Sequence, residues 1–156
     1  MPSVKSDTKG RELIFSRLLN APKKLVWKIW TNPEHLSLWW GPDGFTNTIK
    51  KMEIKPGGKW DLIMHGPDGT DYDIHCIFLE IEKEKKIVYQ QLTQFRYIAT
   101  ILFEGRGDQT FIYWQMLFES KECLIEAAKT YGVIAGFQQN AEKLVDYLLQ
   151  FDNNQL

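Results

Sequence analysis

The chain has 156 residues and a formal net charge of −1 at neutral pH, with 44% hydrophobic and 25% charged residues. This length suits one domain with its own core, and the composition is that of a globular protein rather than a disordered chain. The charge excludes the basic excess that is typical of nucleic-acid-binding domains, since even the densest charged run, at 82–86, mixes both signs.

The cysteines and the polar start of the chain indicate its compartment. Cys76 and Cys123 lie far apart and belong to no CxxC or Cys/His cluster. A disulfide framework in so short a chain would need more cysteines, so we expect a reducing cytoplasm. Residues 1–10 lack the apolar segment of a signal peptide, and no run approaches the roughly 18 consecutive apolar residues of a membrane span. We therefore expect a single cytoplasmic domain over residues 1–156, without membrane insertion.

The first predicted elements are one strand and two short helices. Alternation of apolar and polar residues over 12–19 predicts the strand. Asn20-Ala21-Pro22 then has an N-cap residue and a first-turn proline, and Asn32-Pro33 repeats this signal ten or so residues later. A helix is expected after each signal, and Gly41-Pro42 ends the second one.

Six further strands are predicted in the middle of the chain, separated by short turns rich in glycine, proline or charge. The strand-like runs occupy residues 46–54, 59–65, 72–81, 86–92, 98–104 and 110–118. Because the connections between them are short, successive strands are expected to pair in an antiparallel meander.

The last predicted element is a long amphipathic helix over about residues 133–150. Its apolar positions recur at steps of three and four, at Ile134, Phe137, Ala141, Leu144, Leu148 and Phe151. An opposing polar stripe is formed by Gln139, Lys143, Asp146 and Gln150. One face of this helix is therefore suited to burial and the other to solvent.

This order of elements predicts an α+β fold. An antiparallel sheet of about seven strands would wrap around the long C-terminal helix, with two short helices between the first and second strands. The sheet must bury one face, and the long helix is the only predicted element large enough to cover it. A twisted sheet around a helix leaves space near the short helices, and we expect a cavity there.

Motifs spread in order over nearly the whole chain carry a family resemblance. The first are Ala21-Pro22, Val26–Trp30, Asn32–Leu36, Trp39–Pro42, Gly44-Phe45, Lys55–Trp60 and Gly66–Gly69. The others are Glu80-Ile81, Gly136-Phe137, Leu144 and Tyr147-Leu148. Together they resemble the heat-shock protein 90 ATPase activator homologue domain, within the START-like or birch-pollen-allergen-like (SRPBCC) superfamily. One departure is Phe137, at a position where that family commonly has tryptophan.

The resemblance implies a helix-grip fold with a hydrophobic pocket. It implies no particular reaction, because the superfamily includes lipid carriers, hormone receptors, cyclases and chaperone activators. The leading prediction is that the domain binds an apolar or amphipathic small molecule in an internal cavity, without catalysis and without a cofactor. The alternatives are a protein-interaction module related to chaperone ATPase activators, and a cyclase-like or hydratase-like enzyme that uses the cavity.

The predicted cavity walls are large side chains expected to face inward: Trp40, Trp60, Leu62, Met64, Tyr72, Ile74, Phe78, Trp114 and Phe137. Polar groups that could orient a ligand among them are Glu80, Tyr113 and Gln90. Strand alternation points Glu80 inward, where Arg96 or Arg106 could pair with its carboxylate. The end of the strand could equally bring that carboxylate to water.

His65 and His75, with Asp61 and Asp73 nearby, are the best candidates for a metal or acid–base site. The turn between their strands allows two hairpin registers. We favour the register that gathers the apolar residues on one face, with Trp60, Leu62 and Met64 beside Tyr72 and Ile74. Both histidines then face solvent without enough converging ligands, so we expect no metal ion and no catalytic residue.

Overall fold

A computed structural model of the protein describes residues 10–151, so residues 1–9 and 152–156 of the predicted domain lie outside the described part. The strands are β1 (Glu12–Leu19), β2 (Thr46–Met52), β3 (Lys59–His65), β4 (Asp71–Glu82), β5 (Lys86–Gln91), β6 (Tyr97–Arg106) and β7 (Gln109–Leu117). The helices are α1 (Lys23–Thr31), α2 (Pro33–Trp39), α3 (Lys121–Tyr131) and α4 (Val133–Leu148).

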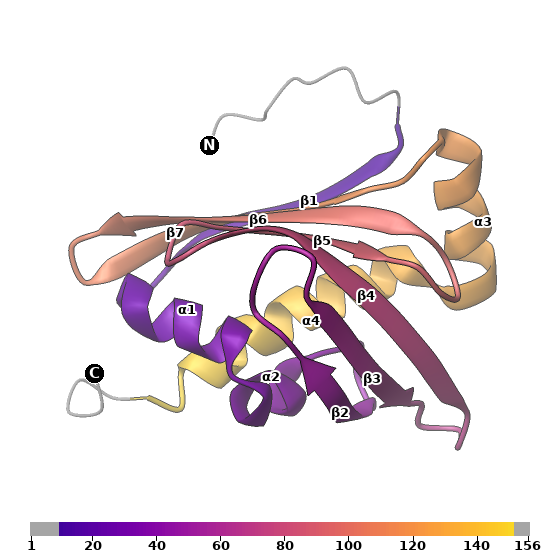
Figure 1. The fold of residues 1–156 in the computed structure, drawn as a ribbon, viewed down its shortest axis with the longest axis horizontal. Helices are drawn as coiled ribbons and strands as arrows, with labels where there is room; N and C mark the ends of the chain where they lie inside the picture. The colour runs from indigo at the N-terminus through magenta and orange to yellow at the C-terminus, as the bar shows by residue number, and fades with distance from the viewer. Residues whose placement is uncertain (1–9, 152–156) are drawn as a thin grey trace.

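The seven strands form one antiparallel sheet in the order β1-β7-β6-β5-β4-β3-β2. Its two edges, β1 and β2, are connected in sequence through α1 and α2. Figure 1 shows α4 lying along one face of the sheet, with α1 and α2 toward one end and α3 at the other. The predicted α+β architecture and its helix-grip arrangement are confirmed.

The two short helices begin in different ways. Pro22 is the N-cap of α1 and no side chain caps that helix, so the prediction of Asn20 as its cap is wrong. The helix starts later than predicted because the backbone stays extended through Pro22. At α2 the prediction is confirmed, since Pro33 is its first residue and the Asn32 side chain accepts a hydrogen bond from the Glu34 amide at 3.0 Å.

Helix α3 was missed by the sequence interpretation, which predicted no element between residues 118 and 133. The helix buries only Leu124 and Ala127, so it lacks the broad apolar stripe by which amphipathic helices are recognised. Its start was nevertheless signalled, because the Ser120 side chain accepts a hydrogen bond from the Cys123 amide at 3.1 Å. It ends at Gly132, whose φ of +65° favours glycine.

Helix α4 buries a wider stripe than its spacing predicted. The buried residues are Val133, Gly136, Phe137, Asn140, Ala141, Leu144, Tyr147 and Leu148. Ile134 was predicted on this face, but the residue is 45% exposed. A Cβ atom at Gly136 would lie 3.1 Å from Pro42 Cγ, so the α2–β2 loop packs closely against the helix at this glycine.

The same loop contacts two residues of the predicted polar stripe. The Asp43 amide donates to Gln139 Oε1 at 3.0 Å, and Lys143 Nζ donates to the Pro42 carbonyl at 3.3 Å. The prediction that Gln139 and Lys143 simply face solvent is therefore wrong. Both residues stay partly exposed, so the loop contacts the stripe without burying it.

Candidate functional site

A pocket lies between α4 and the inner face of the sheet, with a volume of about 120 Å³ available to the centre of a water-sized molecule. Its apolar lining comprises Trp40, Gly41, Pro42, Phe45, Met64, Ile74, Phe95, Trp114, Met116, Gly132, Val133, Gly136 and Phe137. Its polar lining comprises Tyr72, Tyr89, Gln91, Gln94, Tyr97, Tyr131 and Asn140. All of these residues lie within the described part of the chain, and none of them is charged or a histidine.

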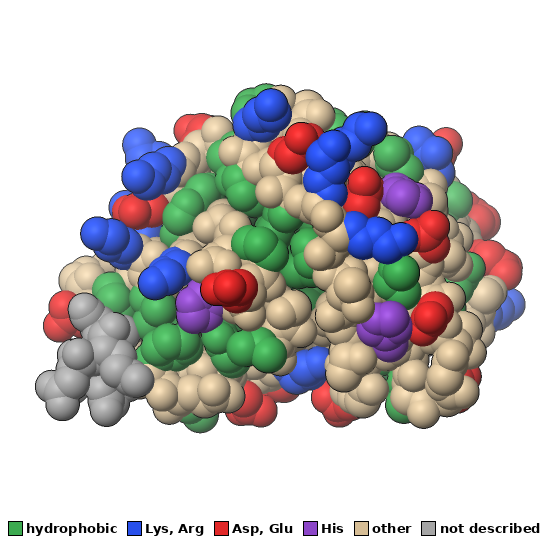
Figure 2. Space-filling model, turned by 60° about the horizontal axis from the view of Figure 1, so that its bottom comes forward, with side chains coloured by type: hydrophobic (Ala, Val, Ile, Leu, Met, Phe, Trp, Pro, Cys, Tyr) green, Lys and Arg blue, Asp and Glu red, His purple; other side chains and the backbone are tan. Residues whose placement is uncertain are grey.

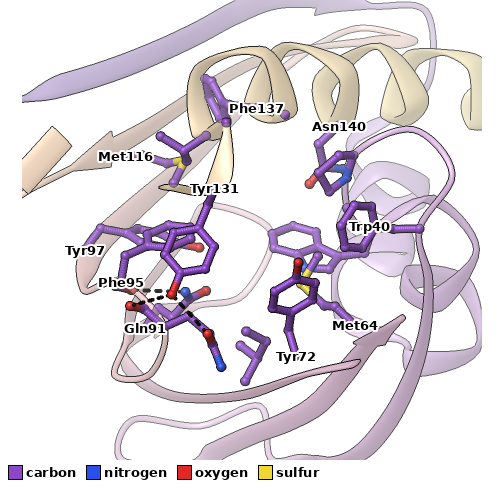
Figure 3. A pocket seen from close by; sticks show the side chains of 18 of the residues that line it. Trp40, Met64, Tyr72, Gln91, Phe95, Tyr97, Met116, Tyr131, Phe137 and Asn140 are labelled. Carbon is purple, nitrogen blue, oxygen red and sulfur yellow. Dashed lines mark hydrogen bonds between the residues drawn. The ribbon is translucent and has the colours of Figure 1, made fainter. Parts of the chain in front are cut away.

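The hairpin of β3 and β4 supplies one wall of the pocket. Leu62 pairs with Ile74 and Met64 pairs with Tyr72, which confirms the favoured register. Since successive strand residues face opposite sides of a sheet, Met64, Tyr72 and Ile74 all turn toward α4. Figure 3 shows Met64, Tyr72 and Trp40 on one side of the cavity, facing Tyr97, Met116 and Tyr131 on the other.

Six of the predicted wall residues line the pocket, namely Trp40, Met64, Tyr72, Ile74, Trp114 and Phe137. Trp60, Leu62 and Phe78 are buried on the same face of the sheet but belong to the core beside the pocket. The Trp60 and Phe78 rings stack on each other with centroids 5.8 Å apart, and together they fill this part of the core.

Glu80 does not face inward, so that part of the sequence interpretation is wrong. The pairing of β4 with β5 shifts register between Phe78 and Glu80, and this bulge reverses the alternation that pointed the carboxylate toward the core. Its side chain is 54% exposed and its Oε1 lies 2.8 Å from Lys86 Nζ. Neither Arg96 nor Arg106 is its partner.

The other two polar candidates, Gln90 and Tyr113, do not line the pocket either. Gln90 pairs with Ile77 and Ile98, while its neighbour Gln91 faces the cavity. Residues two apart on a strand share a face, so placing the large side chain of Tyr89 on the inner face would also have placed Gln91 there.

Two side-chain amides bring hydrogen-bonding atoms into the apolar wall. Gln91 is 5% exposed, and its Nε2 donates to the carbonyls of Thr93 and Phe95, both at 3.0 Å. Asn140 is 6% exposed, and its Nδ2 donates to the Trp39 carbonyl at 3.0 Å. Because a carbonyl can only accept, these bonds fix each amide with its nitrogen toward the backbone. No described residue donates to either amide oxygen.

Tyr89 and Tyr97 form a buried hydroxyl pair in the wall, with their oxygens 2.8 Å apart. Burial raises the pKa of both phenols well above the usual value, so both hydroxyls remain neutral. One hydroxyl donates to the other, which leaves one of the two protons free for a further acceptor.

Tyr131, the last residue of α3, lies at the edge of the pocket. Its hydroxyl donates to the Gln94 carbonyl at 3.4 Å and to Gln94 Oε1 at 3.2 Å. Its ring lies 5.0 Å from that of Phe95, measured between centroids. These contacts join the end of α3 to the β5–β6 loop, as the dashed lines in Figure 3 show.

The histidines of the β3–β4 hairpin lie on the outer side of the sheet, away from the pocket. His75 Nδ1 lies 2.9 Å from Asp61 Oδ1, and its Nε2 lies 3.3 Å from Asp73 Oδ2. The hydrogen bond to Asp61, supported by Asp73, raises the pKa of His75. The two ring nitrogens of His65 form hydrogen bonds with the side chains of Thr48 and Asp71. Figure 2 shows histidines beside acidic side chains at the surface.

Within residues 10–151, no group of three or more His, Cys, Asp or Glu side chains is arranged to hold a metal ion. Among the helices described, none is both long and apolar enough to cross a membrane.

A seven-stranded antiparallel sheet around one long helix, with two short helices between its first two strands in sequence, defines a helix-grip domain of the START-like (SRPBCC) class. The chain belongs to the family described as Activator of Hsp90 ATPase homolog 1-like protein, whose model matches residues 20–149. Among curated proteins, none is similar enough in sequence to be counted as a relative.

Solved structures of bacterial proteins share this fold. A protein from Arthrobacter aurescens is 27% identical with a TM-score of 0.85, over 97% of this chain and 93% of that chain. One from Nitrosomonas europaea is 20% identical with a TM-score of 0.80, over 91% of this chain and 96% of that chain. One from Mycobacterium smegmatis is 18% identical with a TM-score of 0.78, over 97% of both chains.

Proposed function

We propose that this protein binds a small uncharged molecule in the cavity between α4 and the sheet, without catalysing a reaction. The observation that carries this proposal is the lining, which combines aromatic and aliphatic side chains with a few neutral polar groups. Small-molecule sites are built in this way, with apolar walls for affinity and a few polar atoms for orientation. A charged ligand would lose its hydration in such a site and gain no opposite charge.

The size of the cavity indicates the size of the ligand. A volume of about 120 Å³ is available inside it. An engineered apolar cavity of about 150 Å³ in another protein binds benzene, so a molecule of roughly one ring suits the space. A long acyl chain would require the walls to move apart.

The lining also argues for binding over acid–base catalysis. A general acid or base works best with a pKa near the operating pH, and His, Asp, Glu and Lys most often fill that role. The titratable groups that line this cavity are tyrosines, and burial raises the pKa of Tyr89 and Tyr97 further from neutrality. An interaction module that activates a chaperone ATPase is the second candidate, favoured only by the description of the family.

Isothermal titration calorimetry with phenol, benzyl alcohol, anisole and toluene tests the proposal. We expect saturable 1:1 binding of at least one of these rings. Val133 lines the cavity at the start of α4, so Val133→Phe should fill it and weaken binding by on the order of tenfold. Ile134→Phe places the same ring at the next residue, outside this cavity, and should leave binding unchanged. No binding by any ring, or equal loss in both variants, would contradict the proposal.

A further inference from the structure

The two amide oxygens in the cavity wall have no partner, although their side chains are more than nine-tenths buried. The side-chain nitrogens of Gln91 and Asn140 donate hydrogen bonds to backbone carbonyls. The amide oxygens, Gln91 Oε1 and Asn140 Oδ1, accept no hydrogen bond from a donor among residues 10–151. Figure 3 shows the two amides at separate places around the cavity, Gln91 beside Phe95 and Asn140 on α4. Neither oxygen is among the fully enclosed polar atoms that lack a partner, so each stays accessible at the cavity wall and can accept a hydrogen bond from an occupant.

The Tyr89–Tyr97 hydroxyl pair comes from strand positions neighbouring one of these acceptors. Gln91 on β5 is directly opposite Tyr97 on β6, and Tyr89 is two residues before Gln91 on the same face. Directly opposite residues have Cβ atoms roughly 5 Å apart, so their side chains contact a common neighbour. The Tyr89–Tyr97 pair holds one proton with no acceptor, and the Gln91 oxygen needs a proton. This corner of the cavity therefore suits a group that donates and accepts at once.

A hydroxyl group meets that requirement with one atom, whereas an ether, a ketone, a carboxylate or a hydrocarbon does not. An ether or ketone only accepts, so it would leave the Gln91 oxygen unpaired. A carboxylate also only accepts, and no cation among the lining residues would offset the loss of its hydration. A hydrocarbon would displace the water that solvates both amide oxygens and replace none of its hydrogen bonds.

The indole of Trp114 does not supply the donor. It lines the cavity, but its Nε1 is buried with no acceptor among the described residues and is not accessible to a molecule in the space. At this part of the wall the polar groups left for an occupant are the Gln91 oxygen and the Tyr89–Tyr97 hydroxyl pair.

We infer that the cavity selects uncharged single-ring compounds that carry a hydroxyl group, with phenol as the simplest. This inference rests on the proposed function and names the ligand class of the same site. The ligand hydroxyl donates to Gln91 Oε1 and accepts the spare proton of the Tyr89–Tyr97 pair. A second hydroxyl across the ring, as in hydroquinone, donates to Asn140 Oδ1.

Calorimetry of the wild-type protein with a matched set of ligands at pH 7 tests the selectivity. We expect phenol to bind about three- to tenfold more tightly than toluene or anisole, since one net hydrogen bond contributes that much. Hydroquinone should bind more tightly than phenol, and benzoate should bind more weakly than any neutral ring. If toluene or anisole binds as well as phenol, the inference fails while the proposed function stands. If no neutral ring binds, the proposed function itself fails.

Variants assign the selectivity to the two amides. In Gln91→Met the phenol-to-toluene affinity ratio should fall to about 1, because a side chain of similar length without the acceptor fills the position. Gln90→Met, the adjacent residue on the outer face, should keep the wild-type ratio. The ratio is compared within each variant, so a general loss of stability does not mimic the effect.

Asn140→Leu should abolish the advantage of hydroquinone over phenol but keep the preference for phenol over toluene. The exposed neighbour Gln138→Leu serves as its control. The Tyr89→Phe/Tyr97→Phe double variant provides the same test as Gln91→Met if that variant does not fold. Wild-type ratios in both Gln91→Met and the double variant, or in the double variant alone where Gln91→Met does not fold, would overturn the inference.

Discussion

Truncation of Leu144 tests whether α4 is the central core element. Leu144 lies in the middle of that helix and is 0% exposed. Leu144→Ala removes the equivalent of three buried carbons, which costs about 2.4 kcal/mol at about 0.8 kcal/mol each. The void left behind raises the loss in the free energy of unfolding toward 4–5 kcal/mol, as in measured Leu→Ala series. For a chain of this size we expect the melting temperature to fall by roughly 8–20 °C.

Urea denaturation followed by tryptophan fluorescence measures this loss, because all the tryptophans are buried. Gln138→Ala on the exposed side of α4 is the matched control and should change stability by no more than about 0.5 kcal/mol. Phe137→Ala should cost less than the usual 3–5 kcal/mol for a buried Phe, since its ring borders an existing cavity. Equal losses for Leu144→Ala and Gln138→Ala would refute the burial of α4.

Four further measurements check other parts of the account. A thiol reagent should modify exposed Cys123 in the native protein and reach Cys76 only on unfolding, since Cys76 is buried and burial raises its pKa. In an NMR titration His75 should have a pKa above 6.5 because Asp61 stabilises its protonated form, and His35 a pKa below 6.5 because burial disfavours its charge. Because the pKa is raised in the folded state, protonated His75 contributes its full stabilisation below about pH 6.5, and this contribution disappears as the pH rises through the folded-state pKa. His75→Gln should therefore lower the free energy of unfolding more at pH 5.5 than at pH 8.5. The protein should not raise the ATPase rate of a heat-shock protein 90, and a saturable, dose-dependent rise would favour the interaction module instead.

The sequence predicts the sheet well because apolar residues alternate along the strands. Only one register of the β3–β4 hairpin places Leu62 and Met64 beside Ile74 and Tyr72 on one face, and the structure has that register. Helix α3 could not be recognised from periodicity, since it buries two residues only.

The polar part of the candidate site was harder to predict than its apolar walls. The bulge after Phe78 turns Glu80 outward, and a one-residue irregularity of this kind leaves no clear trace in the alternation. Asn140 is a polar residue within the buried stripe of α4, three positions after Phe137. Its partner, the Trp39 carbonyl, is 101 residues away in the chain, so only the folded structure shows why an amide belongs there.

The methyl signals of the methionines test the central claim, that the cavity binds a small uncharged molecule, most directly. Met64 and Met116 line the cavity, whereas Met52 on β2 does not. In a titration with phenol, we expect the ε-methyl resonances of Met64 and Met116 to shift together and saturate at one equivalent of bound ligand, while that of Met52 stays in place. Shifts that do not saturate, or that affect Met52 as much as the two cavity methionines, would contradict the account.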